Sequence, residues 1–169
     1  SAVTKSRTRI SRAYSKLAFS LINDGFEAVI RDPSCLNSRA KVQLGAAYAG
    51  VAIENSMLGA AHAAANPLTS HCGVVHGQAV GVMIPHVIAW NSEDEDIRKI
   101  YEDLYPGDLP GRVVELMDMV GIYKGISDFG VEGELISTLA GEAARQWTAE
   151  FNPREAHCED FKRLYTAAM

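Results

Sequence analysis

Apolar residues recur at helical spacing along most of the chain. After residue 11 they keep the i, i+3, i+4 rhythm of one buried helix face; the residues of this face are Tyr14, Leu17, Ala18, Leu21, Ile22 and Gly25. We expect Ser11 to cap this helix, and residues 31–34, which include Pro33, to end it. Residues 1–10 are basic and poor in apolar side chains, which predicts an exposed lead-in.

A second helix is expected from residue 37 or 38 to about Ala65. Alanine and glycine occur on every face of this segment, and a helix that is apolar all round is a buried one. Proline disfavours helical backbone at the residue before it, so Asn66 and Pro67 should end the helix and begin a loop over residues 66–75. The segment therefore predicts the central helix of a bundle.

Shorter helices are expected in the second half of the chain. The segment from His76 to about Trp90 is almost wholly apolar, and the acids of residues 92–96 begin an amphipathic helix that ends before Pro106. The remaining predicted segments are helices at 109–120, at 132 to about 147 and around 161–165, with a loop at 123–131. No segment keeps the alternating period of a strand. The pattern predicts an all-α fold, a multi-helix bundle around a buried Ala/Gly-rich central helix.

The composition narrows the class of protein. The 169 residues suit a single domain, since 47% of them are apolar. The net charge of −5, without a Lys/Arg cluster, argues against nucleic acid or an anionic membrane as partner, and no run of ~20 apolar residues occurs. Three cysteines at unrelated spacings fit a reducing compartment better than a disulfide framework. With no signal peptide at its start, we expect a cytoplasmic protein.

Histidines carry the candidate chemistry, and four of the five lie between residues 54 and 91. His62 stands near the end of one predicted helix and His76 at the start of the next, so their imidazoles can converge on one point. A cation is the commonest reason for imidazoles to do so. The spacing matches no recognised zinc motif. The alternative, core histidines bonded to backbone carbonyls, therefore stays open on the residues alone.

The same stretch resembles the signature region of the iron-dependent (group III) alcohol dehydrogenases. That signature reads G-x-x-H-x-x-x-H/N-P-L, then H-G, then L-P-H-V and an asparagine. The matching residues are Gly59, His62, Asn66-Pro67-Leu68, His76-Gly77, Ile84-Pro85-His86-Val87 and Asn91. The ending Asn152-Pro153-Arg154, followed by Glu159-Asp160, is also similar to that of the family.

The resemblance implies a fold and a site. The fold would be that of a dehydroquinate synthase-like C-terminal domain. His62 and His76 would be the third and fourth ligands of a divalent metal, iron in the first place, with zinc, nickel or cobalt as alternatives. The metal would lower the pKa of an alcohol oxygen while hydride leaves for NAD(P). The substrate would be a small alcohol or aldehyde.

The resemblance also implies that residues 1–169 form one helical metal-binding domain of a longer enzyme. No Gly-rich phosphate turn follows a strand, so the N-terminal nucleotide-binding domain is absent from this chain, and the first two ligands, an Asp and a His, would precede Ser1. We expect the isolated chain to be inactive, and its uncovered face to favour self-association as a homodimer. The alternative is a non-catalytic helical assembly module.

Other polar residues near the site receive weaker roles. Asn66 stands where some members carry a histidine proposed to relay a proton; it cannot titrate and should instead end the helix. His71 and Cys72 are expected to line a pocket. His86 resembles a structural position, and His157 should face solvent. Residues 152–154 predict a helix boundary, with the asparagine as cap and the proline as first helical residue, and no catalytic role.

Overall fold

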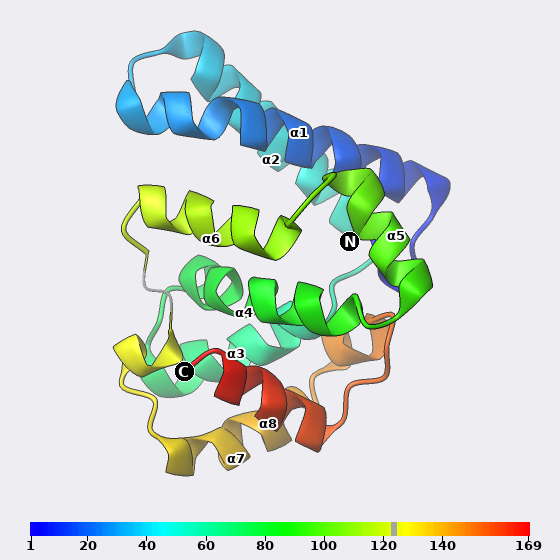
Figure 1. The fold of residues 1–169 in the computed structure, drawn as a ribbon, viewed down its shortest axis with the longest axis vertical. Coiled ribbons are helices and arrows are strands. Elements are labelled where there is room, and N and C mark those ends of the chain that lie inside the picture. Colours follow the sequence, from blue (N-terminus) through cyan, green and yellow to red (C-terminus); the bar gives the residue numbers. More distant parts are fainter. Residues whose placement is uncertain (123–124) are drawn as a thin grey trace.

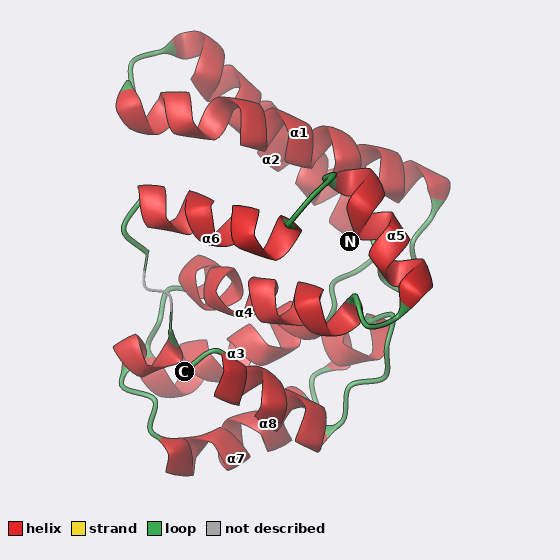
Figure 2. Ribbon diagram, in the orientation of Figure 1, coloured by secondary structure: helices red, strands yellow, loops and turns green. Residues whose placement is uncertain are grey.

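The computed structural model describes residues 1–122 and 125–169, and this part of the chain contains helices and no strand (Figure 2). The predicted all-α fold is confirmed. Tyr123 and Lys124 of the predicted loop lie outside the described residues. The elements are α1 (Arg9–Arg31), α2 (Leu36–Glu54), α3 (Ala60–Cys72), α4 (His76–Asn91), α5 (Glu95–Leu104), α6 (Leu109–Met119), the 3-10 helix η1 (Ile126–Phe129), α7 (Gly133–Ala143), the 3-10 helix η2 (Trp147–Phe151) and α8 (Cys158–Ala167).

Helices α1 and α2 form a long antiparallel hairpin at one end of the molecule (Figure 1). Gly45 makes the close contact: a Cβ there would lie 2.7 Å from Cγ1 of Ile22 and 3.0 Å from the carbonyl oxygen of Ala18. Tyr14 and Tyr48 pack across the hairpin with ring centroids 5.3 Å apart. The predicted apolar face of α1 therefore packs mainly on α2.

The start of the chain differs from the prediction in two ways. The N-cap of α1 is Thr8, and Ser11 is the third helical residue; each side chain oxygen accepts from the backbone N–H of the other residue. The lead-in is partly buried, with Val3 6% and Thr4 2% exposed. The hydroxyl of Thr4 donates to the carbonyl of Ser56 over 2.5 Å. Tertiary hydrogen bonds thus hold a segment whose composition predicts exposure.

The predicted second helix is two helices, α2 and α3, separated by residues 55–59. Met57 lies in this break with a φ of 66°, a backbone conformation that is rare outside glycine. The buried Ala-rich helix exists, but it is α3: every alanine of α3 is buried, whereas Leu36 and Leu44 of α2 are 80% and 44% exposed. A continuous central helix from residue 37 to residue 65 was the wrong prediction.

Helix α3 continues through Pro67 to Cys72 and ends at Gly73, which adopts the left-handed conformation with φ 66°. The predicted break at Asn66 and the loop after it are therefore wrong, except for residues 73–75. Proline inside a helix costs ~3 kcal/mol. The packing of α3 against α4, α7 and η2 offsets that cost, as does the hydroxyl of Tyr165, which donates to the carbonyl of Ala64 over 2.6 Å.

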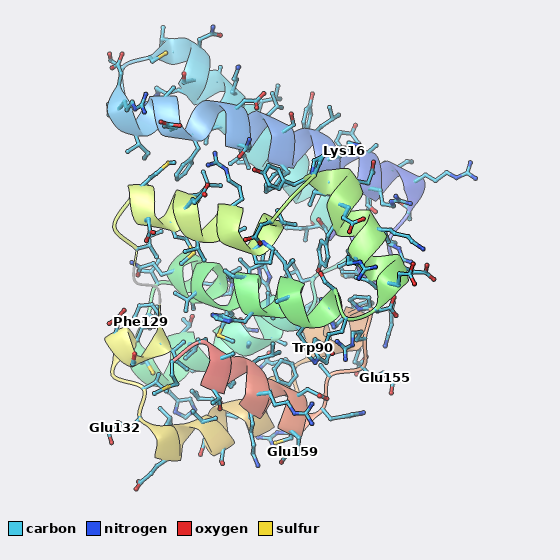
Figure 3. The ribbon with its side chains drawn as sticks, in the orientation of Figure 1. Lys16, Trp90, Phe129, Glu132, Glu155 and Glu159 are labelled. Atoms are coloured by element: carbon cyan, nitrogen blue, oxygen red, sulfur yellow. The ribbon has the colours of Figure 1, made fainter. Side chains whose placement is uncertain are left out.

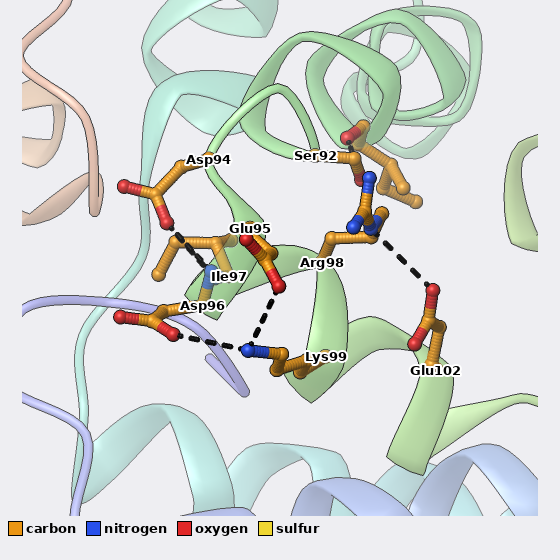
Figure 4. Close-up of polar contacts among 9 residues, drawn as sticks. Ser92, Asp94, Glu95, Asp96, Ile97, Arg98, Lys99 and Glu102 are labelled. Carbon is orange, nitrogen blue, oxygen red and sulfur yellow. Dashed lines mark hydrogen bonds and ion pairs between the residues drawn. The ribbon is translucent and has the colours of Figure 1, made fainter.

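The remaining helices follow their predicted positions closely. Asp94 caps α5, as the acidic run predicts, by accepting from the backbone N–H of Asp96 and Ile97 (Figure 4). Helix α7 is shorter than expected and ends at Ala143. No helix of the described residues is long and apolar enough to cross a membrane.

Two clusters of buried side chains form the core. The larger one joins α3, α4, α7 and α8; its largest fully buried members are Tyr165, Phe161, Leu68 and Met83. The smaller one gathers Val3, Ile88, Ile97, Tyr101 and Leu109 between the chain start, α4, α5 and α6. The hairpin lies outside the larger cluster, so the core is built around α3 and α4.

Candidate metal centre

The imidazoles of His62 and His76 lie next to each other, one from α3 and one from α4. Their ring centroids are 5.3 Å apart and the ring planes are inclined by 54°. His62 is in the first turn of α3, since Gly59 is the N-cap, and His76 is the first residue of α4. The predicted convergence is therefore observed, although its predicted cause is wrong, because His62 begins a helix rather than ending one.

The separation of the rings suits two ligands of one divalent ion. An imidazole nitrogen lies about 2.0–2.1 Å from such an ion, which places the ring centroid roughly 3.2 Å from it. Two rings at a tetrahedral angle around one ion would then have centroids roughly 5.2 Å apart. The observed 5.3 Å is compatible with this arrangement.

The electrostatics favour the neutral imidazole, which is the form that binds a metal. His62 is half-buried, and its pKa is lowered to about 4 by burial first, then by His76 and by the α-amino group of Ser1. Burial also lowers the pKa of that amino group to about 6. Ser1 therefore lies close enough to act on the candidate ligand.

No third ligand stands beside the pair within the described residues, where no group of three or more His, Cys, Asp or Glu side chains is arranged to hold an ion. Two imidazoles alone leave most coordination positions to water or to other donors. The pair is thus half of a metal site at most.

An apolar cavity of about 330 Å³ opens beside His62. Its walls come from α1, α2, α4, α5 and α6, together with the chain start and the segment after η2. The lining also includes His62 of α3 itself, together with Ile53, Leu58, Ile84 and Asn152. The candidate ligand therefore borders a space that suits a hydrocarbon group more than a charged one.

The neighbouring polar residues are occupied elsewhere. Asn66 donates through Nδ2 to Oε1 of Gln146 over 2.9 Å, so its amide holds η2 against α3 and does not end the helix. His71 pairs with the carboxylate of Glu142 at 3.0 Å, and Cys72 is half-buried. Neither residue contributes to a three-ligand group in the described part of the chain.

Of the two other histidines, His157 faces solvent as predicted, and the structural role predicted for His86 stays a prediction. His86 lies half-buried on α4, and burial lowers its pKa. The side chain of His157 is 77% exposed, and the residue caps α8. The prediction that residues 152–154 begin a helix is wrong, because α8 starts six residues after Asn152.

Asn152 is the residue that sequence reasoning missed. It is 2% exposed, and its amide reaches the first turn of α3. The sequence offered two signals, its place in the family-like ending Asn152-Pro153-Arg154 and a polar residue between Phe151 and Pro153. Turn chemistry explains the second equally well, and neither indicated a contact with α3.

Comparisons with known proteins agree with this architecture. Residues 3–169 match the Fe-containing alcohol dehydrogenase family, C-terminal. Lactaldehyde reductase of Escherichia coli K12 is 32% identical over 141 residues, covering 76% of this chain and 37% of that protein. NAD-dependent methanol dehydrogenase of Bacillus methanolicus is 26% identical over 180 residues, covering 99% and 47%.

The fold has close counterparts among solved structures. One of them, 1,3-propanediol oxidoreductase, superposes with a TM-score of 0.91 at 22% identity, over 99% of this chain and 47% of that one. The chain thus spans less than half the length of the proteins it matches.

Proposed function

Because this chain belongs to the Fe-containing alcohol dehydrogenase family and corresponds to its C-terminal domain, we propose that His62 and His76 bind the catalytic metal of an NAD(P)-dependent alcohol dehydrogenase. The observation that carries the proposal is the pair of neighbouring imidazoles, 5.3 Å apart, at the start of two adjacent helices. The metal is a divalent ion, iron in the first place, with zinc, nickel or cobalt as alternatives.

A bound ion would supply Lewis-acid chemistry at an alcohol oxygen. This chain's own residues hold and orient the ion: His62 from the first turn of α3 and His76 from that of α4. An aspartate and a further histidine, four residues apart on one helix face, would complete the ligand set upstream of Ser1. Ser1 and His62 line the same cavity, so a segment preceding Ser1 would start near the pair.

The cavity beside His62 would receive the carbon chain of the substrate and keep water away from it. Its apolar walls favour small alcohols and aldehydes over charged substrates. The names of two relatives, a lactaldehyde reductase and an NAD-dependent methanol dehydrogenase, support this substrate class and the nicotinamide cofactor. An N-terminal nucleotide-binding domain would hold that cofactor in the full-length protein, which we expect to be cytoplasmic. Exposed apolar residues of α2 would help two copies of the protein to form a homodimer.

Metal content tests the proposal. The full-length protein, purified anaerobically, is compared by elemental analysis with a His62→Ala/His76→Ala double variant and with a His157→Ala control. We expect bound metal in the parent and the control and its loss in the double variant. Equal metal in all three would leave the histidines as core residues and favour the non-catalytic assembly module.

The isolated chain of 169 residues gives a second test. With neither a nucleotide-binding domain nor a full ligand set, it should show no oxidation of a primary alcohol with NAD⁺ or NADP⁺ in a spectrophotometric assay of reduced nicotinamide. Turnover above that of the His62→Ala/His76→Ala variant would contradict the assignment of residues 1–169 as half of a two-domain site.

A further inference from the structure

The buried amide of Asn152 uses its full hydrogen-bonding capacity. Its Oδ1 accepts from the backbone N–H of Ala60 at 3.2 Å and from Nδ2 of Asn91 at 3.3 Å. Its Nδ2 donates to Oδ1 of Asn91 and to the carbonyl of Arg154, both at 2.9 Å. An amide offers two acceptor and two donor positions, so no other side chain of that size reproduces this set.

These bonds meet both helices that carry the candidate ligands. Ala60 is the first residue of α3, whose N-cap, Gly59, offers no side-chain cap. Asn152 therefore satisfies a backbone N–H that the helix itself leaves open, two residues before His62. Asn91 is the last residue of α4, the helix that His76 begins, and it is 1% exposed.

The neighbouring Arg154 contacts the end of α4 and Glu93, which follows that helix. Its guanidinium lies 4.1 Å from the ring centroid of Trp90, a residue that Figure 3 labels. It also donates to the carbonyl of Trp90 and to Oε2 of Glu93. A cation at a helix C-terminus is favourable, but none of these side-chain contacts reaches α3. Asn152 thus contacts both helices, whereas the side chain of Arg154 contacts only the end of α4 and Glu93.

On the premise that His62 and His76 bind the metal as proposed above, we propose that Asn152 is a positioning residue of the metal site. Its amide oxygen fixes the first turn of α3, and with it the direction in which the His62 imidazole faces His76. Asn91 holds the amide of Asn152 in the orientation that presents oxygen to Ala60. Loss of the amide frees this turn, so the two rings no longer present their nitrogens to one ion.

Nickel titration of the 169-residue chain tests this. Ni²⁺ affinity is measured calorimetrically for the parent, Asn152→Ala and Arg154→Met. Arg154→Met is the matched control. It removes the contacts of the guanidinium with the end of α4 but keeps the backbone carbonyl of residue 154, which accepts from Asn152. We expect Asn152→Ala to lower the affinity about tenfold, the range seen when a group that orients a ligand is lost. Arg154→Met should change it less than about twofold.

The ¹⁵N resonances of the imidazoles give a second measurement. In Asn152→Ala those of His62 should shift, while those of His157 should not. If Asn152→Ala fails to fold, Asn152→Ser replaces it, since its hydroxyl leaves a polar group near Asn91 but is too short to reach Ala60.

The outcomes separate two hypotheses. Equal Ni²⁺ affinity in the parent and in His62→Ala/His76→Ala overturns the proposed function, and the positioning role with it. A parent that binds through the two histidines, with Asn152→Ala unchanged, overturns the positioning role alone. An equal loss in Asn152→Ala and Arg154→Met also overturns it, because general loosening of the fold would then explain the effect.

Discussion

The α1–α2 hairpin and the α3–α4 pair are both units of two helices, but they are held together differently. In the hairpin, the two helices pack mainly on each other, through the bare backbone at Gly45 and through Tyr14 and Tyr48. In the α3–α4 pair, the fixing contacts come from far along the chain, from Asn152 and Tyr165. The candidate ligands lie on the second unit, so their geometry depends on the whole domain.

The largest expected change in stability is that of a leucine-to-alanine substitution in α3, compared with the same substitution in α2. Leu68 of α3 is fully buried, whereas Leu36 of α2 is 80% exposed. Leu68→Ala should lower the free energy of unfolding by about 3–5 kcal/mol, since it leaves a cavity in the core. Leu36→Ala should stay within about 0.5 kcal/mol. Urea unfolding followed by circular dichroism measures both, and equal losses would show that the hairpin face is buried in solution.

Helix boundaries were predictable wherever the signal is local. Asp94 caps α5 and Pro106 follows it, both as the sequence indicates. The break at residues 55–59 has only a weak local signal, since Asn55 caps the end of α2. It is also stabilised by the hydroxyl of Thr4, which bonds to Ser56, 52 residues away. Likewise Pro67 stops no helix, since tertiary packing outweighs its local preference.

In the candidate site, too, some features were predictable from the sequence and others depend on contacts between distant residues. The pairing of His62 with His76 was predictable from the resemblance to a known family, although the predicted place of His62 at the end of a helix is wrong. The role of Asn152 was not, because its partners Ala60 and Asn91 are 92 and 61 residues away in sequence. A contact of that range leaves no periodic pattern for sequence reasoning to detect.

An intermediate effect is expected at the hairpin interface. Gly45→Ala should destabilise the protein by about 1–3 kcal/mol, because the added methyl would overlap Ile22. Gly50 lies on the same helix, but a Cβ added there would meet no atom within 4 Å. Gly50→Ala should therefore stabilise the protein by ~0.5–1 kcal/mol through helix propensity. Thermal unfolding of the two variants distinguishes them. Shifts in the same direction would refute the close contact.

The smallest expected effect is that of pH on the free energy of unfolding. The histidines responsible should belong to the α3–α4 pair, since no histidine lies in α1 or α2. The pKa of His62 falls to about 4 in the folded chain from its ordinary value of 6.5. The unfolded chain then binds more protons between these values, so stability is complete above pH 6.5 and is lost as the pH falls towards 4.

Thermal unfolding of the metal-free chain across this pH range measures the loss. His62→Gln should reduce the dependence to the part that His86 contributes, since burial also lowers the pKa of His86. The control His157→Gln, which alters an exposed side chain, should leave the dependence as it is. A dependence that is unchanged in His62→Gln would assign the titration to another group. Because His62 is only partly shielded from water, we expect a shift smaller than those of the substitutions above.

The tilted contact of Tyr14 with Tyr48 gives the hairpin an optical signature. Both tryptophans, Trp90 and Trp147, lie after the hairpin in the chain. Fluorescence excited at the red edge of indole absorption therefore reports on the half of the domain that carries the histidines. Tyrosine circular dichroism in the near ultraviolet includes the signal of the packed phenol rings between α1 and α2. A single unlabelled sample can thus reveal whether the two halves melt together or one after the other.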